Sequence, residues 1–349
     1  MSSAAPLLLL SLLAGGDDDP WLGPTVGAPL RQDEAQPLRL GWLVRAFYSN
    51  SPPEAGAPGA SADQSGFELE DLDGFLAYET LDVAVRLSVD LDEAAEGGDV
   101  LVEDAWARWQ HLDWMALAVG RFKPRVLRSN AVPQDGLLFR ERTFLGAAFD
   151  RWDDGFELSG LLDEFGYFLA LTDGENGDAS EHFLSARGVW ALVDEGFADR
   201  EGPLGAPNHL RVVLGAALFH DDGLSDGGFA TDLALTFGPY GFHFEWASLG
   251  DQFTREVDVF DGHLMTLGDG HPYATTLSRR IGSHGEVGLR LQQADEADDT
   301  EALGLSASWS PDGGALRFVA DLERVEGDTR DFSLFTVGVE LGSSGLGAR

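Results

Sequence analysis

The sequence contains no cysteine, and only one of its 23 basic residues, Lys123, is a lysine. Without cysteine the chain has no disulfide, no thiolate metal site and no cysteine nucleophile. Basic charge is also scarce, since 60 acidic residues bring the formal net charge to −37. Nucleic acid is therefore excluded as a partner, because the phosphates of its backbone would be repelled by so acidic a chain.

Long hydrophobic runs are absent too. No run reaches the roughly 18 apolar residues that a membrane-spanning helix needs. If the chain crosses a bilayer, it must therefore do so with strands. The short apolar stretch from Leu7 to Leu13 resembles an export signal that lacks the usual basic residues in front. We expect residues 1–16 to be a signal peptide, with an N-terminal tail at 17–37 and a C-terminal tail at 342–349.

Enzyme signatures are missing as well. The sequence has no phosphate-binding P-loop, no GxSxG nucleophile motif and no HExxH metalloprotease motif. We expect no enzymatic activity, no cofactor and no metal site. A barrel enzyme with a serine and a histidine on neighbouring strands remains an alternative that the sequence leaves open.

What the chain does have is a strict alternation of apolar and polar residues. A period of two is typical of strands with two different faces. In the clearest segment, Tyr240, Phe242, Phe244 and Trp246 fall on one face, and Gly241, His243, Glu245 and Ala247 fall on the other.

Sixteen such segments can be placed between residues 38 and 341, and the links between them are alternately tight and long. An even strand count with short turns at one end and longer loops at the other is typical of outer-membrane barrels, whereas a soluble sandwich has no reason to alternate link lengths. We therefore predict an all-β protein, a single closed antiparallel transmembrane barrel over 38–341. A secreted soluble β protein is the alternative. The segments lie near 38–48, 67–79, 81–91, 100–109, 115–123, 155–162, 165–172, 182–192, 210–220, 229–238, 239–249, 271–281, 285–293, 301–310, 315–325 and 332–341. The link 193–209 is longer than the alternation predicts.

One stretch of this acidic chain is basic. It coincides with the longest link, 124–154, which follows the fifth segment. A loop of this kind can fold into the barrel, where rings of arginine and lysine select anions. The planar fork of arginine also suits phosphate and carboxylate groups. In the alternative interpretation, the same residues pair with an acidic lumen wall and hold the loop in place. The candidate constriction residues are Arg121, Lys123, Arg125, Arg128, Arg140, Arg142 and Arg151.

Short motifs in this region resemble the phosphate-selective porins, the porin O and P family. Gly120-Arg121-Phe122-Lys123-Pro124 is similar to that family's glycine, lysine and proline pattern, and Phe139-Arg140-Glu141-Arg142 is similar to its arginine-bearing third loop. The resemblance implies a sixteen-stranded homotrimeric channel in the bacterial outer membrane, in contact with lipid, that passes small anions such as phosphate. It also makes Lys123, Arg125, Arg128, Arg140 and Arg142 the candidate anion contacts.

Two departures keep other functions open. The selective members of that family are rich in lysine, while this chain has one. The lumen could also be acidic, which would favour a cation-preferring or general porin. A barrel whose third loop closes the lumen, and which conducts nothing, is the remaining alternative. The candidate acidic lumen residues are Glu70, Asp82, Asp90, Glu245, Asp321 and Glu323.

Overall fold

The structure is a computed structural model that describes most of the chain after residue 37. The residues it describes are 38–50, 65–80, 82–92, 98–112, 114–174, 181–193, 200–204, 206, 208–222, 226–251, 253–259, 263–294, 300–311, 315–327 and 331–342. The expected signal peptide and N-terminal tail lie outside these residues, as does the expected C-terminal tail after Gly342.

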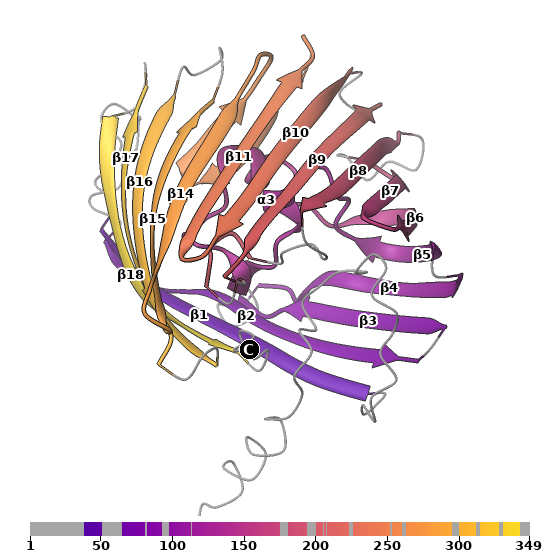
Figure 1. The fold of residues 1–349 in the computed structure, drawn as a ribbon, viewed down its shortest axis with the longest axis horizontal. Coiled ribbons are helices and arrows are strands. Elements are labelled where there is room, and N and C mark those ends of the chain that lie inside the picture. Colours follow the sequence, from indigo (N-terminus) through magenta and orange to yellow (C-terminus); the bar gives the residue numbers. More distant parts are fainter. Residues whose placement is uncertain are drawn as a thin grey trace, which may run out of the picture.

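Sixteen antiparallel strands close into one barrel, in which β1 pairs with β2 on one side and with β18 on the other (Figure 1). The predicted fold class is confirmed, and each of the sixteen expected segments corresponds to one barrel strand with ends shifted by a few residues. The barrel strands are β1 Leu38–Asn50, β2 Gly66–Glu79, β3 Val83–Asp90, β4 Leu101–Leu112, β5 Met115–Phe122, β6 Asp153–Leu162, β7 Phe165–Thr172, β8 Phe183–Val193, β9 Leu210–Asp221, β10 Asp226–Phe237, β11 Tyr240–Leu249, β14 Tyr273–Ile281, β15 Gly285–Gln293, β16 Glu301–Trp309, β17 Leu316–Glu326 and β18 Asp331–Gly342.

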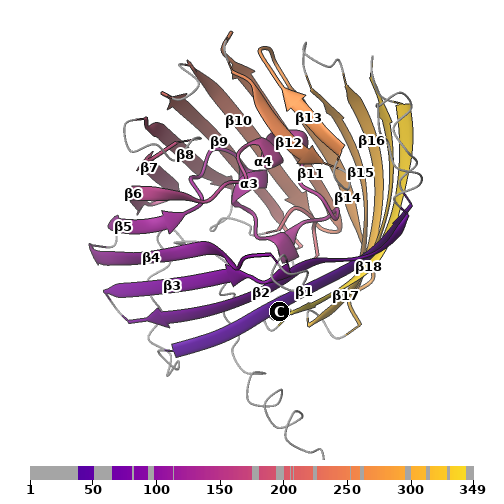
Figure 2. The same cartoon turned by 180° about the vertical axis from the view of Figure 1, so that it is seen from behind.

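The remaining elements lie inside the barrel (Figure 2). The helices α3 Arg128–Ala131, η1 Gln134–Gly136 and α4 Phe144–Ala148 belong to the long link between β5 and β6, and β12 Arg255–Val259 pairs with β13 His263–Leu267 in a separate hairpin. That hairpin was not expected, because the sequence interpretation placed a plain loop at 250–270. None of the helices among the described residues is long and apolar enough to cross a membrane.

The two faces of the barrel wall are inverted relative to a soluble protein. In β16, Leu303 and Leu305 point outward with 47% and 52% of their surface exposed, while Ser306 and Ser308 point into the barrel and are buried. The same alternation repeats around the wall, including the β11 segment whose faces the sequence predicted. An apolar exterior and a polar interior are what a lipid bilayer outside and a wet lumen inside require.

An apolar cluster fills part of the interior. Helix α4 packs against the β12–β13 hairpin and against side chains of the barrel wall (Figure 2). The short alternation of the hairpin serves this contact, since Val257, Met265 and Leu267 are each at most 3% exposed. We call this set the lumen core. Its larger members are Val126, Leu127, Phe144, Leu145, Phe149, Phe183, Phe219, Leu249, Phe253, Val257, Met265, Leu267, Val325, Phe332 and Leu334.

Candidate pore constriction

The link between β5 and β6, residues 123–152, folds into the barrel; we call it loop L3 (Figures 1 and 2). Asn130 holds its two ends together. The Asn130 side-chain oxygen accepts hydrogen bonds from the backbone N–H groups of Val126 and Leu127 at 3.1 and 2.8 Å. Its amide nitrogen donates to the carbonyls of Pro124 and Phe149 at 2.8 and 3.1 Å. L3 therefore has a compact base that does not depend on the barrel wall.

One carboxylate of the wall anchors both α-helices of L3, α3 and α4. Glu245, on β11, is fully buried and accepts hydrogen bonds from the N–H and the hydroxyl of Ser129 at 2.9 and 2.7 Å. It also accepts one from the hydroxyl of Thr143 at 2.8 Å. Thr143 is the N-cap of α4 and accepts a hydrogen bond from Gly146 N–H at 2.9 Å. The same threonine thus caps the start of α4 and attaches that helix to the wall.

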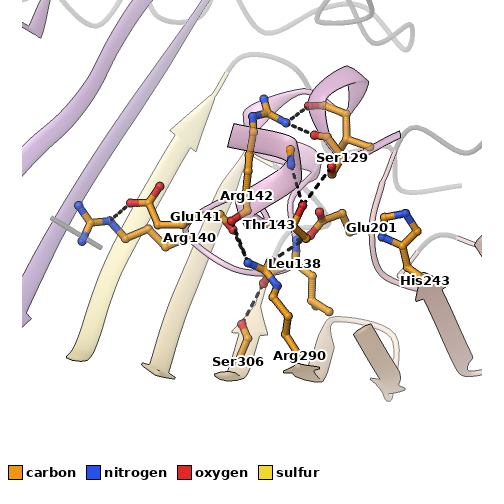
Figure 3. Close-up of polar contacts among 12 residues, drawn as sticks. Ser129, Leu138, Arg140, Glu141, Arg142, Thr143, Glu201, His243, Arg290 and Ser306 are labelled. Carbon is orange, nitrogen blue, oxygen red and sulfur yellow. Dashed lines mark hydrogen bonds and ion pairs between the residues drawn. The ribbon is translucent and has the colours of Figure 1, made fainter. Parts of the chain in front are cut away.

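The middle of L3 is held by side chains of β15 and β16, as Figure 3 shows. Arg290, on β15, donates to the carbonyls of Glu141 and Arg142 at 2.9 and 3.1 Å. Ser306, on β16, donates to the carbonyl of Leu138 at 2.9 Å. These contacts occupy backbone acceptors that would otherwise be buried without a donor.

Arg140 is paired with carboxylates of the wall. Its guanidinium lies 2.9 Å from Glu70 and 3.3 Å from Glu68, and it stacks over the ring of Phe47 at 4.8 Å. Its backbone N–H donates to Asp321 at 2.6 Å. Only 4% of Arg140 is exposed, so its charge is directed to β2 rather than to an open passage.

Lys123 and Arg142 share one partner, Asp150. The Lys123 ammonium donates to Asp150 and lies 3.9 Å from the centre of the Trp152 ring, and Arg142 Nε lies 2.9 Å from the same carboxylate. Arg142 also donates to two backbone carbonyls of L3. Burial acts first on both pKa values: it lowers that of Lys123, and it raises that of Asp150, where Arg142 and Lys123 outweigh it and bring the pKa below its usual value.

The other four basic candidates have separate surroundings. Arg121 is partly exposed, lies 3.4 Å from Asp154 and donates to the Val102 carbonyl at 2.9 Å. Arg125 lies 4.5 Å over the ring of Phe168, and Arg128 donates to the carbonyl of Arg200. Arg151 is half-buried. The structure thus spreads the seven candidates over several partners, and the pairing of Lys123, Arg140 and Arg142 agrees with the interpretation in which they hold the loop.

Gly120 explains the first residue of the glycine-containing motif. Its φ of +122° lies in a region that other residues rarely adopt, and a Cβ there would collide with the Ala105 carbonyl on β4. The glycine lets β5 come this close to β4 just before Arg121 and Lys123 leave the wall. Its role here is in the backbone.

The wall that faces the basic side of L3 is acidic. Its carboxylates come from β2, β3 and β4. Arg45 and Arg86 of the wall pair with some of them, as does Arg140 of L3. Of the acidic lumen residues expected from the sequence, only Asp82 is misplaced, since it is exposed at the tight link before β3. Among the described residues, no three histidine, aspartate or glutamate side chains form a group that could hold a metal ion. The carboxylates of this acidic wall are Glu68, Glu70, Asp71, Asp73, Asp90, Glu103 and Asp104.

Residues 200–204, in the long link between β8 and β9, contact L3 inside the lumen, which the sequence interpretation did not predict. The Glu201 carboxylate accepts a hydrogen bond from Leu138 N–H at 3.1 Å, and Glu201 N–H donates to the Gly136 carbonyl at 3.0 Å. Arg200 and Leu204 both donate to Glu286 on β15, at 3.3 and 3.2 Å. L3 is therefore contacted by a second segment, and the unexpected length of the 193–209 link was the only sequence signal for it.

Comparison with solved structures gives the same architecture. An anion-selective porin from Comamonas acidovorans superposes with a TM-score of 0.61 at 13% identity, over 87% of this chain and 99% of that one. The fold is that of the sixteen-stranded porins. A mutant of the Rhodopseudomonas blastica porin matches with a TM-score of 0.57 at 13% identity, over 87% and 99% of the two chains. A loop-deletion mutant of OmpT, an outer membrane protein of Vibrio cholerae, matches with a TM-score of 0.55 at 11% identity, over 87% and 98%.

These identities are low enough that the likeness concerns the fold alone. No protein-family model and no curated protein matches the sequence. The porin barrel that the motifs implied is thus confirmed as architecture. The assignment to the phosphate-selective family rests on the short motifs alone.

Proposed function

We propose that this chain is a porin of the bacterial outer membrane that admits small charged solutes by passive diffusion. The observation that carries the proposal is the inverted wall: apolar side chains such as Leu305 and Trp309 face outward, while charged and hydroxyl side chains face the lumen. A belt of this kind is stable in lipid, and a charged lumen holds water. Passive diffusion of the solute through the barrel would need no cofactor.

The proposal extends to anions such as phosphate, with a narrower set of contacts than the sequence predicted. Arg121, Arg125 and Arg151 are partly exposed, so an anion passing along L3 could reach them. Arg128, Arg140 and Arg142 are buried; they act by holding the loop and by adding to the local positive potential. Trimerisation, which the resemblance implies, is part of the same proposal.

The lumen core favours a second candidate, a barrel that conducts nothing. Apolar residues from L3 and from the β12–β13 hairpin are packed without exposure in the middle of the barrel, as at Leu145 and Leu267. Such packing excludes water from part of the cross-section. The two candidates differ in whether a water-filled path remains beside the core.

The deciding experiment is the conductance and reversal potential of the purified protein in a planar bilayer, under a potassium chloride gradient. A porin gives discrete conductance steps, and an anion path along L3 gives an anion-selective potential. Replacing Arg121, Arg125 and Arg151 with glutamine should then shift the potential toward cations, whereas Arg324→Gln, at an exposed site on β17, should leave it unchanged. Absence of conductance supports the closed barrel, and an unaltered potential in the triple variant removes these arginines from the mechanism.

A further inference from the structure

We propose that Asp73 and Asp90 form a cation-binding subsite on the acidic wall of the lumen, and that its occupant is a hydrated divalent cation such as Mg²⁺. The subsite lies opposite the basic side of L3 and is separate from the arginines considered above. It deepens the proposed function, on which it rests for access of solute to the lumen.

The strand register brings the two carboxylates together. Asp73 on β2 is directly opposite Asp90 on β3, and the next inward pair along these strands is Phe75 with Ser88. Directly opposite residues on one face of an antiparallel pair have their Cβ atoms about 4.5–5.5 Å apart, and like charges in this position destabilise the sheet. The barrel thus places two carboxyl groups side by side, where a bound cation would allow both to be ionised.

In the part of the chain that the structure describes, neither carboxylate forms an ion pair with an arginine or a lysine, and Arg45, which is paired with Asp71, acts on Asp73 only at longer range. Asp73 is only 7% exposed, and its Oδ1 has no hydrogen-bond partner there. Asp90 accepts a hydrogen bond from Asp92 N–H, at 2.9 Å. The third neighbour, Glu103, is another carboxylate, which accepts a long hydrogen bond from Ser88 at 3.4 Å.

Nearby carboxylates show how this wall is neutralised elsewhere. Asp71 lies 2.6 Å from Arg45, and Asp104 lies 2.8 Å from Arg86. Arg45 and Arg86 of the wall therefore form their ion pairs with the flanking carboxylates. A buried carboxylate without a counter-charge is costly, and at Asp73 and Asp90 the missing charge is one that a mobile cation can supply.

The site fits an ion that keeps most of its water. Mg²⁺ dehydrates reluctantly and is commonly held by one or two carboxylates, with water completing the octahedron. This explains why no cage of three metal-binding side chains is needed, and none is found among the described residues. Asp90 and Glu103 are half-buried rather than enclosed, so the ion can reach Asp73 from the lumen.

The test is the effect of magnesium chloride on potassium conductance in planar bilayers. Mg²⁺ is expected to reduce the potassium conductance of the wild type. Asp73→Asn is expected to raise the Mg²⁺ concentration that gives half-block by about tenfold, because the ion loses one of its two carboxylate partners. Asp82→Asn is the matched control, because it removes the same charge at the exposed tight link before β3 and should leave the block unchanged. Equal block in Asp73→Asn and the wild type would overturn the proposal.

A second measurement does not depend on conduction. In detergent, Mg²⁺ should raise the melting temperature of the wild type and of Asp82→Asn, but not that of Asp73→Asn. Asp73→Asn itself should fold, because it relieves the repulsion from Asp90. If the barrel melts at the same temperature with and without Mg²⁺, the subsite is wrong. If it conducts nothing yet shows the Asp73-dependent shift, the subsite stands and the proposed pore fails.

Discussion

Removing the Glu245 carboxylate should release loop L3 from the barrel wall. Glu245 is fully buried and accepts three hydrogen bonds, two from Ser129 and one from Thr143, at 2.7–2.9 Å. A hydrogen bond to a charged group contributes about 1.5–3 kcal/mol, and a buried donor left without its acceptor costs a similar amount. Because the three bonds share one acceptor and are not additive, we expect Glu245→Ala to weaken the attachment of L3 by about 3–5 kcal/mol.

The assay is single-channel conductance together with the entry of uncharged sugars of increasing size into liposomes. Glu245→Ala should raise the conductance and the size limit and should lower the melting temperature. Glu245→Gln keeps one oxygen acceptor, so we expect an intermediate effect. Glu326→Ala is the control, since that glutamate is exposed at the end of β17 and exposed pairs contribute little. If both Glu245 variants keep wild-type conductance and melting temperature, the anchoring role assigned to this carboxylate is refuted.

Two further predictions concern the other attachments of L3. Gly202→Ala would place a methyl group against the Glu286 carboxylate; we expect it to push the β8–β9 link out of the lumen and raise the conductance, and an unchanged conductance would show that this link does not narrow the pore. Asp150 has a folded-state pKa below its ordinary value of 3.8, so the ion pairs with Lys123 and Arg142 stabilise L3 fully above that pH and are lost as the pH falls through the lowered value. Because other lumen carboxylates titrate between pH 7 and pH 3, the measurement is the difference in melting temperature between the wild type and Asp150→Asn. That difference should shrink at the acid end, and a difference that does not change with pH would contradict the assignment.

The strands could be predicted from the sequence because lipid and water impose opposite demands on alternate residues. An inward position such as Glu245 differs in polarity from its outward neighbours Phe244 and Trp246, and this contrast recurs along most strands outside the lumen core. Each tight link fixes one pair of neighbouring strands, and an even strand count with alternating links is typical of a barrel in which sequential strands are neighbours. The local alternation and the link lengths are therefore enough to predict a closed barrel.

The interior could be predicted only in part, because its contacts join residues far apart in the chain. The basic composition of L3 indicated that the loop would enter the lumen, but the partners of Arg140 come from β2 and those of Ser129 from β11. The contact of Leu138 with Glu201 spans 63 residues, and nothing local to the 193–209 link predicts it. The β12–β13 hairpin has strands of five residues each, which are too short for a period of two to stand out.

Because the first strand pairs with the last, the barrel can close only when β18 is present. Arg45, on β1, lies 3.2 Å from Glu340, on β18, and the two residues are 295 positions apart. Both are buried, and Glu340 also forms an ion pair with Arg317, on β17, at 3.0 Å. A chain that ends before Glu340 leaves these two guanidinium groups without that carboxylate and leaves the edge of β1 open. Because uncompensated buried charge and an unpaired edge are both unfavourable in lipid, the barrel wall can close only in a chain that carries β18.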